Sequence, residues 1–310
     1  MAVNERAWDQ LLTLACCVLD PVNAAPDPTY PQLRLNLMDN HTKTVLQQAD
    51  KYARNKQYRC LVPGCTEKAI CSHSVPRSLC QEALAEKGVV YSRPMGFNTL
   101  RMTASTDPAP IVPVGAKLAG VFKGYCARHD ASLFAAVETA NCKRKRPMFI
   151  ALHLRALSLE YCRKRQVFDY YSKIAEQTTD TEERAFTVGV AQQTETWLAC
   201  FEKLYLGSLF NMITGSDVDS VDYFCLPFSR NLQVSCCGCF DATPGAFDSV
   251  IAYNLISYTD MTLMILTTFT AVKHHLDGYL AQFSLPKDCE RLVNDIAFYQ
   301  CEEPLIAPQL

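Results

Sequence analysis

The sequence predicts an α+β protein in which a zinc-stabilised module is followed by a helix-rich domain that carries a small antiparallel sheet. Three observations predict this class. Cysteines and histidines at metal-ligand spacing lie between residues 60 and 129, apolar residues at helical spacing dominate after residue 147, and strand-like stretches follow over residues 221–269. The 310 residues, 49% of them apolar, suffice for one large domain or for two ordinary domains with cores of their own.

Three segments are expected in chain order. Residues 1–57 form an N-terminal helical segment, residues 58–146 form the zinc module, and residues 147–310 form an acidic domain of helices and strands. The first segment is expected to hold helices at 4–19 and 41–57, on either side of the Pro-rich turn NAAPDPTYPQ. The last segment is expected to hold helices from Phe149 to Ala175 and from Thr181 to Phe210, then the strands VDYFCLPF, LQVSCCGCF, SVIAYNLIS and TLMILTTF, then helices near 271–283 and 286–299.

The zinc site is predicted from two pairs of ligands that lie far apart in the chain. Cys60 and Cys65, in RCLVPGC, flank a Pro-Gly turn that aims both thiols at one point. Cys126 and His129, in GYCARHD, are spaced i to i+3 at the start of a helix and supply the other two corners. These four residues are therefore the expected ligands of a structural Zn²⁺.

A second site is expected beside the zinc. Asp130 lies about 100° further round the helix than His129, so its carboxylate faces a neighbouring ion more easily than the zinc. The apolar stretch 68–71 predicts a strand, which places His73 at the strand exit, facing this helix. Arg77 follows His73 closely and is well placed to clamp a phosphate.

The order of strand, histidine, loop, zinc half-site and helix over roughly residues 58–140 resembles the HNH, or ββα-metal, nuclease family. The resemblance implies a ββα-metal module in which His73 is the general base that activates water. It also implies that Asp130 helps to hold a catalytic Mg²⁺ or Mn²⁺ on the scissile phosphate. Asn98, in GFNTL, is the candidate for the asparagine of the family.

The chain departs from the family pattern in three places. Ser72 stands where the family often has Asp or His just before its base, and a hydroxyl is a poor ligand for a hard cation. Asn98 lies further from His73 than the usual hairpin would place it. The stretch from His73 to Cys126 requires a long insertion in the hairpin. The zinc half of the resemblance is therefore closer than the catalytic half.

Other ligand sets and roles stay open on the sequence alone. Cys71 and His73 stand close enough to Cys60 and Cys65 to complete a compact Cys/Cys/Cys/His site, in which His73 would be a ligand and not a base. The four predicted ligands could also form a purely structural zinc clip. A Cys/His nucleophilic pair is a further option, although nothing near Cys71 or Cys80 marks an activated thiol.

The charge of the chain is divided between its halves. Residues 1–166 hold 23 Lys and Arg against 13 Asp and Glu, giving +10, whereas residues 167–310 hold 7 against 19, giving −12. A basic half suits a phosphate backbone, so we expect nucleic acid, with DNA favoured, as its partner. Two basic runs flank the module: Lys51, Arg54, Lys56 and Arg59 before it, and Lys143 to Arg146 after its helix.

The sixteen cysteines are expected to be reduced. We interpret the N-terminal stretch as an amphipathic helix and expect no secretory signal, and no apolar run approaches the ~18 residues needed to cross a bilayer. We therefore expect a cytoplasmic protein without a membrane partner, in which most thiols act as small buried hydrophobes. In CCGC, strand alternation puts Cys237 and Cys239 on one face and Cys236 on the other, which predicts core packing in preference to a metal site.

Together, the residues and the resemblance predict a metal-dependent endonuclease that hydrolyses nucleic-acid phosphodiesters. A nuclease fused to an acidic domain without a catalytic motif has the layout of a bacterial antiviral defence effector. We therefore expect residues 147–310 to hold the activity in check until a protein or ligand trigger arrives. A homodimer is expected too, because many HNH nucleases pair to cut both strands. The alternative, from another class, is a non-catalytic zinc-stabilised adaptor that binds nucleic acid or a protein partner.

Overall fold

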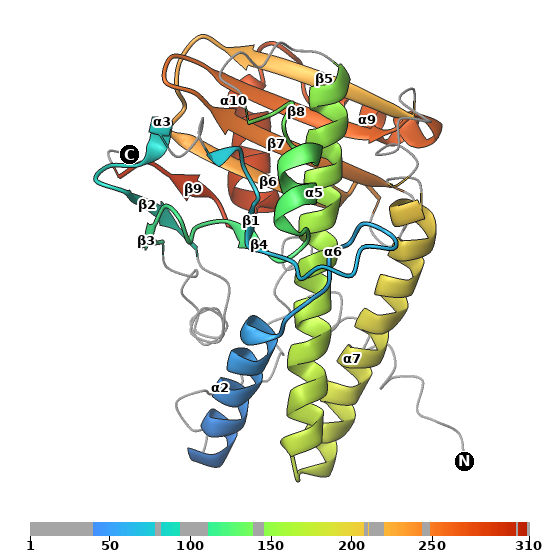
Figure 1. Ribbon diagram of the computed structural model, residues 1–310. Helices are drawn as coiled ribbons and strands as arrows, with labels where there is room; N and C mark the ends of the chain where they lie inside the picture. Colours follow the sequence, from blue (N-terminus) through green and yellow to red (C-terminus); the bar gives the residue numbers. More distant parts are fainter. Residues whose placement is uncertain are drawn as a thin grey trace. The chain divides into compact units, whose positions relative to one another are not determined.

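The computed structural model describes residues 40–77, 82–93, 111–138, 146–207, 210, 220–243, 249–301 and 303–308 (Figure 1). These residues mix helices with an antiparallel sheet, so the expected α+β class is confirmed. The helix expected at 4–19 lies outside the described residues. Asn98, Cys80 and the run from Lys143 to Lys145 lie outside them as well.

The described strands form a two-stranded pair and a seven-stranded antiparallel sheet with the order β3-β2-β9-β6-β7-β8-β5. The four strands predicted after residue 220 match β5 to β8, where β-branched and aromatic residues favour extended chain. The three other strands of this sheet have no counterpart in the prediction. The strands are β2 (Val89–Ser92), β3 (Val112–Gly115), β5 (Val221–Phe228), β6 (Val234–Asp241), β7 (Val250–Ser257), β8 (Thr262–Phe269) and β9 (Leu305–Ile306).

One face of this sheet carries a large apolar core. Ile251, Tyr253 and Leu255 alternate along β7 and point to this face, together with Met264 and Leu266 of β8. Leucine, isoleucine and tyrosine side chains of the C-terminal helices complete the cluster. These helical elements are α9 (Lys273–Leu280), α10 (Cys289–Asn294) and the π-helical turn η5 (Asp295–Gln300), preceded by the short η4 (Thr270–Val272).

The first half of helix α6 (Arg146–Gln177) covers the other face of the sheet. The Asn254 amide donates to the Leu152 carbonyl at 3.5 Å, and Phe149 stacks on Tyr223 with ring centroids 3.9 Å apart. Strand β7 is buried along its whole length because both of its faces are covered.

The cysteines of CCGC pack as predicted. Cys236 lies opposite Leu255 and belongs to the core under the C-terminal helices. Cys237 and Cys239 lie opposite Asn254 and Ala252, whose side chains point to the α6 side. The run therefore divides between the two faces of β6, and it contributes no residue to the metal-ligand cluster found among the described residues.

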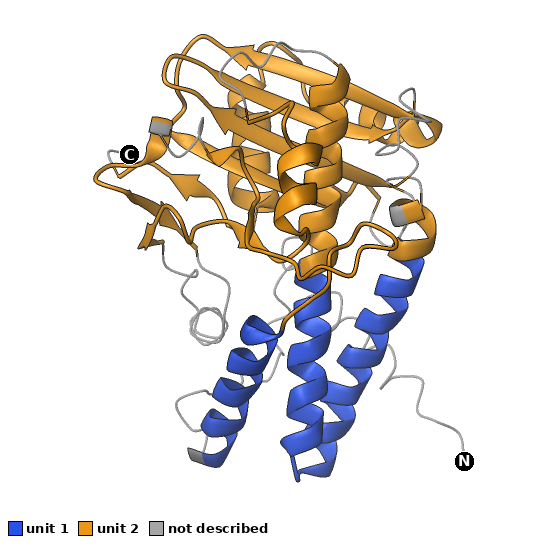
Figure 2. Ribbon diagram, viewed as in Figure 1, with its two compact units in different colours: residues 1–56, 96–110, 163–200 blue, residues 57–95, 111–162, 201–310 orange. Residues whose placement is uncertain are grey.

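The chain divides into two units, shown in blue and orange in Figure 2. The two units do not coincide with the three expected segments. Strands of the expected module and of the expected acidic domain belong to one sheet. Tyr91 of β2 lies opposite Ile306 of β9, and β9 in turn pairs with β6. Residue 146 is therefore not a boundary between independent parts. Unit 1 comprises residues 1–56, 96–110 and 163–200, and unit 2 comprises residues 57–95, 111–162 and 201–310.

Unit 1 contains packed helices. Val45 and Ala49 of α2 (Asn40–Asn55) pack against Ile174 in the second half of α6. Lys56, just after α2, donates to the Asp169 carboxylate at 2.6 Å. Helix α7 (Thr181–Phe201) follows α6 after a short turn, where Asp180 caps it by accepting the Glu183 amide at 2.8 Å, and it continues as the π-helical turn η3 (Glu202–Leu206).

Among the helices that the structure describes, none combines the length and the apolar content needed to cross a membrane.

His153 makes the stability of the protein depend on pH. Its ring is fully buried under the sheet, where Nδ1 lies 3.0 Å from the Thr267 hydroxyl and the ring meets Phe269 edge-on. Burial lowers the pKa of His153 to about 3. The unfolded chain binds this proton near pH 6.5, so acidification from pH 6.5 towards 3 favours unfolding by about 1.4 kcal/mol per pH unit.

We predict that His153→Gln removes this contribution, because glutamine keeps a polar partner for Thr267 but does not titrate. The free energy of unfolding, measured with denaturant at pH 4, 5, 6 and 7, should fall less steeply with falling pH than it does in the unsubstituted chain. The exposed His274→Gln serves as the matched control and should behave like the unsubstituted chain. Equal pH dependence in all three proteins would contradict the prediction.

Candidate metal centre

Four ligand atoms from two distant segments meet in unit 2. Cys60 Sγ lies 3.3 Å from His129 Nδ1, Cys126 Sγ lies 3.4 Å from the same nitrogen, and Cys65 Sγ lies 3.9 Å from Cys126 Sγ. All four ligand atoms lie within 4.8 Å of one another. The structure therefore brings together the four residues that the sequence predicts as zinc ligands.

The first two ligands come from a tight loop. The Cys65 amide donates to the Val62 carbonyl at 3.0 Å, and Gly64 has φ +74°, a left-handed conformation that glycine adopts without strain. The Cys60 amide donates to the Glu67 carbonyl at 2.9 Å, which closes the base of the loop. The turn therefore directs both thiols to one side of the loop, as a zinc knuckle requires.

The other two ligands come from the start of helix α5 (Ala127–Leu133). Cys126 is the N-cap residue, with φ −75° and ψ 163°, and its carbonyl accepts the Asp130 amide at 2.9 Å. His129 lies one turn further along, on the same side of the helix. The helical spacing of the Cys-x-x-His sequence is thus what brings its two ligands together.

The donor set and its spacing fit a tetrahedral zinc ion. Zinc bonded to sulfur at about 2.3 Å and to nitrogen at about 2.0 Å holds neighbouring ligand atoms roughly 3.5–3.8 Å apart. The 3.3–3.9 Å separations observed here lie around that range. Burial raises the pKa of the Cys60 thiol to about 11, whereas the backbone N–H of His129 lowers the pKa of Cys126. A divalent cation in the cluster would stabilise both residues as thiolates.

A short strand pair connects the knuckle loop to α5. Strand β1 (Ser72–His73) pairs antiparallel with β4 (Val121–Phe122), and His73 lies opposite Val121. The strand expected at 68–71 is therefore displaced towards the histidine, because the Ile70 amide instead donates to the Tyr125 carbonyl at 2.7 Å. Residues 74–120 lie between the two strands as a long insertion, as expected, and they include β2, β3 and the single-turn helix α3 (Glu82–Leu84).

His73 is partly buried in a charged environment. Burial lowers its pKa, and the positive charges of Arg77 and Arg155 lower it further, whereas the carboxylates of Glu138 and Asp130 oppose this effect. The Nε2 atom is shielded from solvent and has no hydrogen-bond partner among the described residues.

Two members of this environment, Glu138 and Arg155, are absent from the prediction. The Arg155 guanidinium, on α6, donates to Glu138 Oε1 at 2.6 Å, and the Arg77 backbone N–H donates to Glu138 Oε2 at 3.1 Å. Arginine within the apolar stretch FIALHLRALSL is the signal that could have pointed to a buried charged partner. Its partner depends on tertiary contact, so spacing along the sequence did not identify it.

The remaining predicted residues do not join the cluster. Cys71 is exposed and lies outside the four-ligand set, so the compact alternative with Cys71 and His73 is not the one that forms. Asp130 and His73 belong to no second group of three metal-ligating side chains within the described part of the chain. The asparagine candidate, Asn98, lies outside the described residues.

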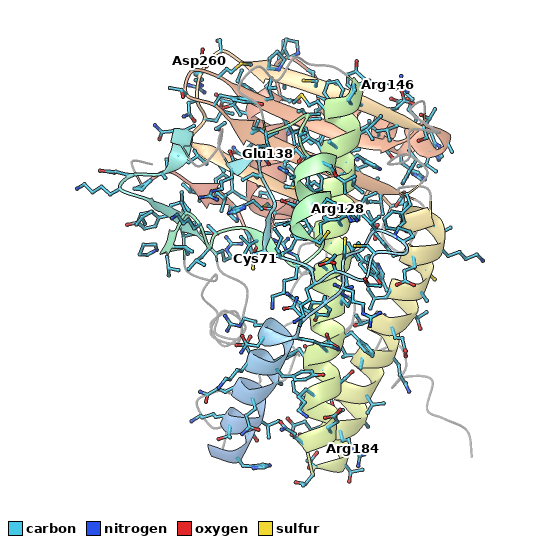
Figure 3. The ribbon with its side chains drawn as sticks, in the orientation of Figure 1. Cys71, Arg128, Glu138, Arg146, Arg184 and Asp260 are labelled. Atoms are coloured by element: carbon cyan, nitrogen blue, oxygen red, sulfur yellow. The ribbon has the colours of Figure 1, made fainter. Side chains whose placement is uncertain are left out.

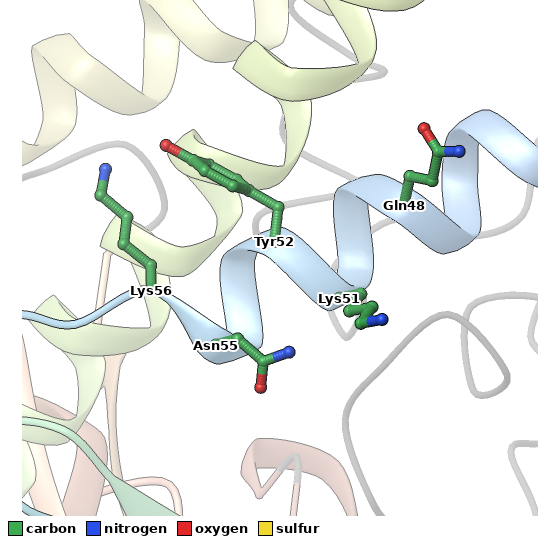
Figure 4. A pocket seen from close by; sticks show the side chains of 5 residues that line it. All are labelled: Gln48, Lys51, Tyr52, Asn55 and Lys56. Atoms are coloured by element: carbon green, nitrogen blue, oxygen red, sulfur yellow. The ribbon is translucent and has the colours of Figure 1, made fainter.

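Lys51 and Lys56, from the basic run that precedes the module, help to line an open hollow of about 470 Å³ in unit 1 (Figure 4). Tyr52 is partly exposed there, and the ammonium groups of Lys56 and Lys173 lie 5.7 and 5.4 Å from its ring centroid. The hollow is shallow, and no cluster of catalytic groups lines it. Its lining residues are Gln48, Lys51, Tyr52, Asn55 and Lys56.

No family model, no curated protein and no solved structure matches this chain.

We predict that Cys60→Ser abolishes zinc binding, because the cluster loses one of its four ligands. Metal content measured by plasma emission should fall from about one zinc per chain to none, and the melting temperature should fall by about 10 °C. The matched control is Cys71→Ser, an exposed cysteine in the same module. Equal zinc content in both variants would show that the ligand assignment is wrong.

Proposed function

We propose that this protein is a metal-dependent endonuclease of the HNH type that hydrolyses nucleic-acid phosphodiesters. The observation that supports this most strongly is the position of His73. It lies on β1, which pairs with β4, and β4 leads to Cys126 and to the helix α5 that carries His129 and Asp130. This succession of paired strands and helix beside a Cys₃His cluster is what the resemblance to the HNH family implies.

In the proposed reaction, the neutral imidazole of His73 accepts a proton from a water molecule. The water oxygen bonds to phosphorus, the bond from phosphorus to the leaving oxygen breaks, and that oxygen takes a proton from solvent. Because burial lowers the pKa of His73, the ring is neutral at pH 7 and able to accept the proton. The exposed side chain of Arg77 holds a phosphate oxygen.

Asp130 is the described residue that would hold the catalytic divalent ion, with Asn98 as the candidate outside the described residues. Magnesium keeps several waters and uses one or two carboxylates together with phosphate oxygens, so a single aspartate on α5 suits it. When bound, Mg²⁺ or Mn²⁺ stabilises negative charge on the phosphate and on the leaving oxygen. The zinc ligands have a structural role only.

A specific observation favours the second candidate, a zinc-stabilised adaptor that binds nucleic acid or a protein and cuts nothing. The Nε2 atom of His73 is shielded from solvent in this structure, and a general base has to reach its water. The same shielding is also what a defence effector held in check by its C-terminal part requires. A trigger of protein or ligand nature would then expose His73, and a homodimer would cut both strands of DNA.

We predict that His73→Ala lowers cleavage of supercoiled plasmid in Mg²⁺ or Mn²⁺ by about 10²–10⁴-fold, which is the usual contribution of a general base. DNA affinity and zinc content should stay unchanged, because His73 is outside the zinc cluster. The exposed His274→Ala should cleave like the unsubstituted chain.

The two candidate functions differ in this experiment. Full cleavage by His73→Ala would exclude His73 as the base. Binding without cleavage by the unsubstituted chain, on plasmid and on single-stranded DNA and RNA, would favour the adaptor.

A further inference from the structure

The ion pair of Glu138 and Arg155 has no role in the reaction proposed above. Glu138 nevertheless contacts Arg77, a residue that takes part in that reaction. The Arg155 side chain is 3% exposed and that of Glu138 is 34% exposed. A buried guanidinium is costly unless a carboxylate neutralises it, so both side chains are held in one arrangement. The Arg155 guanidinium also lies 4.2 Å from the ring centroid of Phe134, the residue that follows α5, and this cation–π contact holds it further. The carboxylate of Glu138 is therefore held in a defined place.

The second oxygen of this carboxylate holds the segment that follows His73. Glu138 Oε2 accepts the backbone N–H of Arg77 at 3.1 Å. At the other end of the same segment, the Ser74 amide donates to the Gly120 carbonyl at 2.6 Å. Gly120 has φ +59°, and a side chain there would meet the Ser74 hydroxyl at 2.6 Å, so this contact requires glycine.

The segment from Ser74 to Arg77 is thus held at both ends. Val75 and Pro76 are buried between these contacts, whereas Arg77 is exposed. Arg77 lies four residues after His73, at the end of this short segment, and its positive charge lowers the pKa of His73. Glu138 binds the backbone of Arg77 directly. It therefore fixes the backbone position from which this exposed side chain extends.

We propose that Glu138 is a positioning residue that keeps the Arg77 guanidinium beside His73, where it receives an oxygen of a nucleic-acid phosphodiester. This inference rests on the proposed nuclease function. A carboxylate alone at this place would repel the phosphate, and Arg155 offsets that repulsion by neutralising Glu138. The roles are divided: Arg77 contacts the substrate, Glu138 places Arg77, and Arg155 orients Glu138.

The test is a double-substitution cycle in the full-length, zinc-loaded chain, with kcat and KM measured on a fluorescent DNA duplex in Mn²⁺. Glu138→Gln should lower kcat/KM by about 10–100-fold, since misplacing a substrate-binding group by about 1 Å has an effect of this size. In the Arg77→Ala background, Glu138→Gln should change kcat/KM by less than about twofold, because the group that it places is gone.

Two further variants separate positioning from stability. Glu138→Met combined with Arg155→Met removes both charges and leaves no unpaired buried ion, so its melting temperature should lie closer to that of the unsubstituted chain than the melting temperature of Glu138→Gln does. Its kcat/KM should nevertheless be as low as that of Glu138→Gln. The exposed Glu290→Gln, on α10, is the matched control and should change neither quantity.

A purely structural role gives a different result, namely a lower melting temperature with unchanged kcat/KM per zinc-loaded molecule, and it overturns the inference. Equal effects of Glu138→Gln in both backgrounds also overturn it. If the unsubstituted chain cleaves nothing, the proposed function fails and a second measurement decides the positioning. Exchange of the Arg77 amide, followed by ¹⁵N-arginine labelling, should be at least about tenfold faster in Glu138→Gln when Glu138 holds it. Unchanged exchange overturns the inference.

Discussion

The arrangement of unit 2 depends on one constraint, which is that the first half of α6 is buried on all sides. A helix that is apolar around its whole circumference has to be covered around its whole circumference. The sheet covers one side, through Phe149 and Leu152, and the metal-binding module covers another, through the 2.5 Å hydrogen bond between the Tyr125 and Ser158 hydroxyls. In Figure 3, the labelled residues Arg128 and Glu138 lie beside this half of the helix. The module and the sheet therefore pack against different sides of the same helix.

The metal-ligand cluster joins two segments that are far apart in the sequence, the loop at Cys60 and Cys65 and the start of α5. The loop around Cys60 and Cys65 is short, and Leu61, Val62 and Pro63 within it are not fully buried, so packing alone would hold it weakly. Backbone hydrogen bonds help, since the Leu61 amide donates to the Gly124 carbonyl at 2.8 Å just before α5. Bonds to a metal add directional attachment that a small loop cannot obtain from a core. The strand pair that carries His73 is joined to these contacts through its Ser72–Phe122 end.

The parts of this structure that could be predicted from sequence are those in which one local pattern determines the result. The ligands Cys60, Cys65, Cys126 and His129 were identified from residue type and spacing, and the apolar runs of β5 to β8 were long enough to be recognised. Strand β9 was missed because it is two residues long and is extended only through its partners β2 and β6. Glu138 and Arg155 were missed because an ion pair between a turn and a helix leaves no periodic signal.

The pairing of β2 with β9 has a consequence for how the protein forms. Residues 89–92 lie within the insertion between the two strands of the His73 pair, and they pair on one side with β3 and on the other, through Tyr91 and Ile306, with β9. Contacts between such distant residues form slowly, because a large loop must close before they stabilise anything. During synthesis, β2 and β3 are therefore made long before the rest of their sheet. The seven-stranded sheet can be completed only after β9 has been synthesised, whereas both strands of the His73 pair are present once residue 122 has been added.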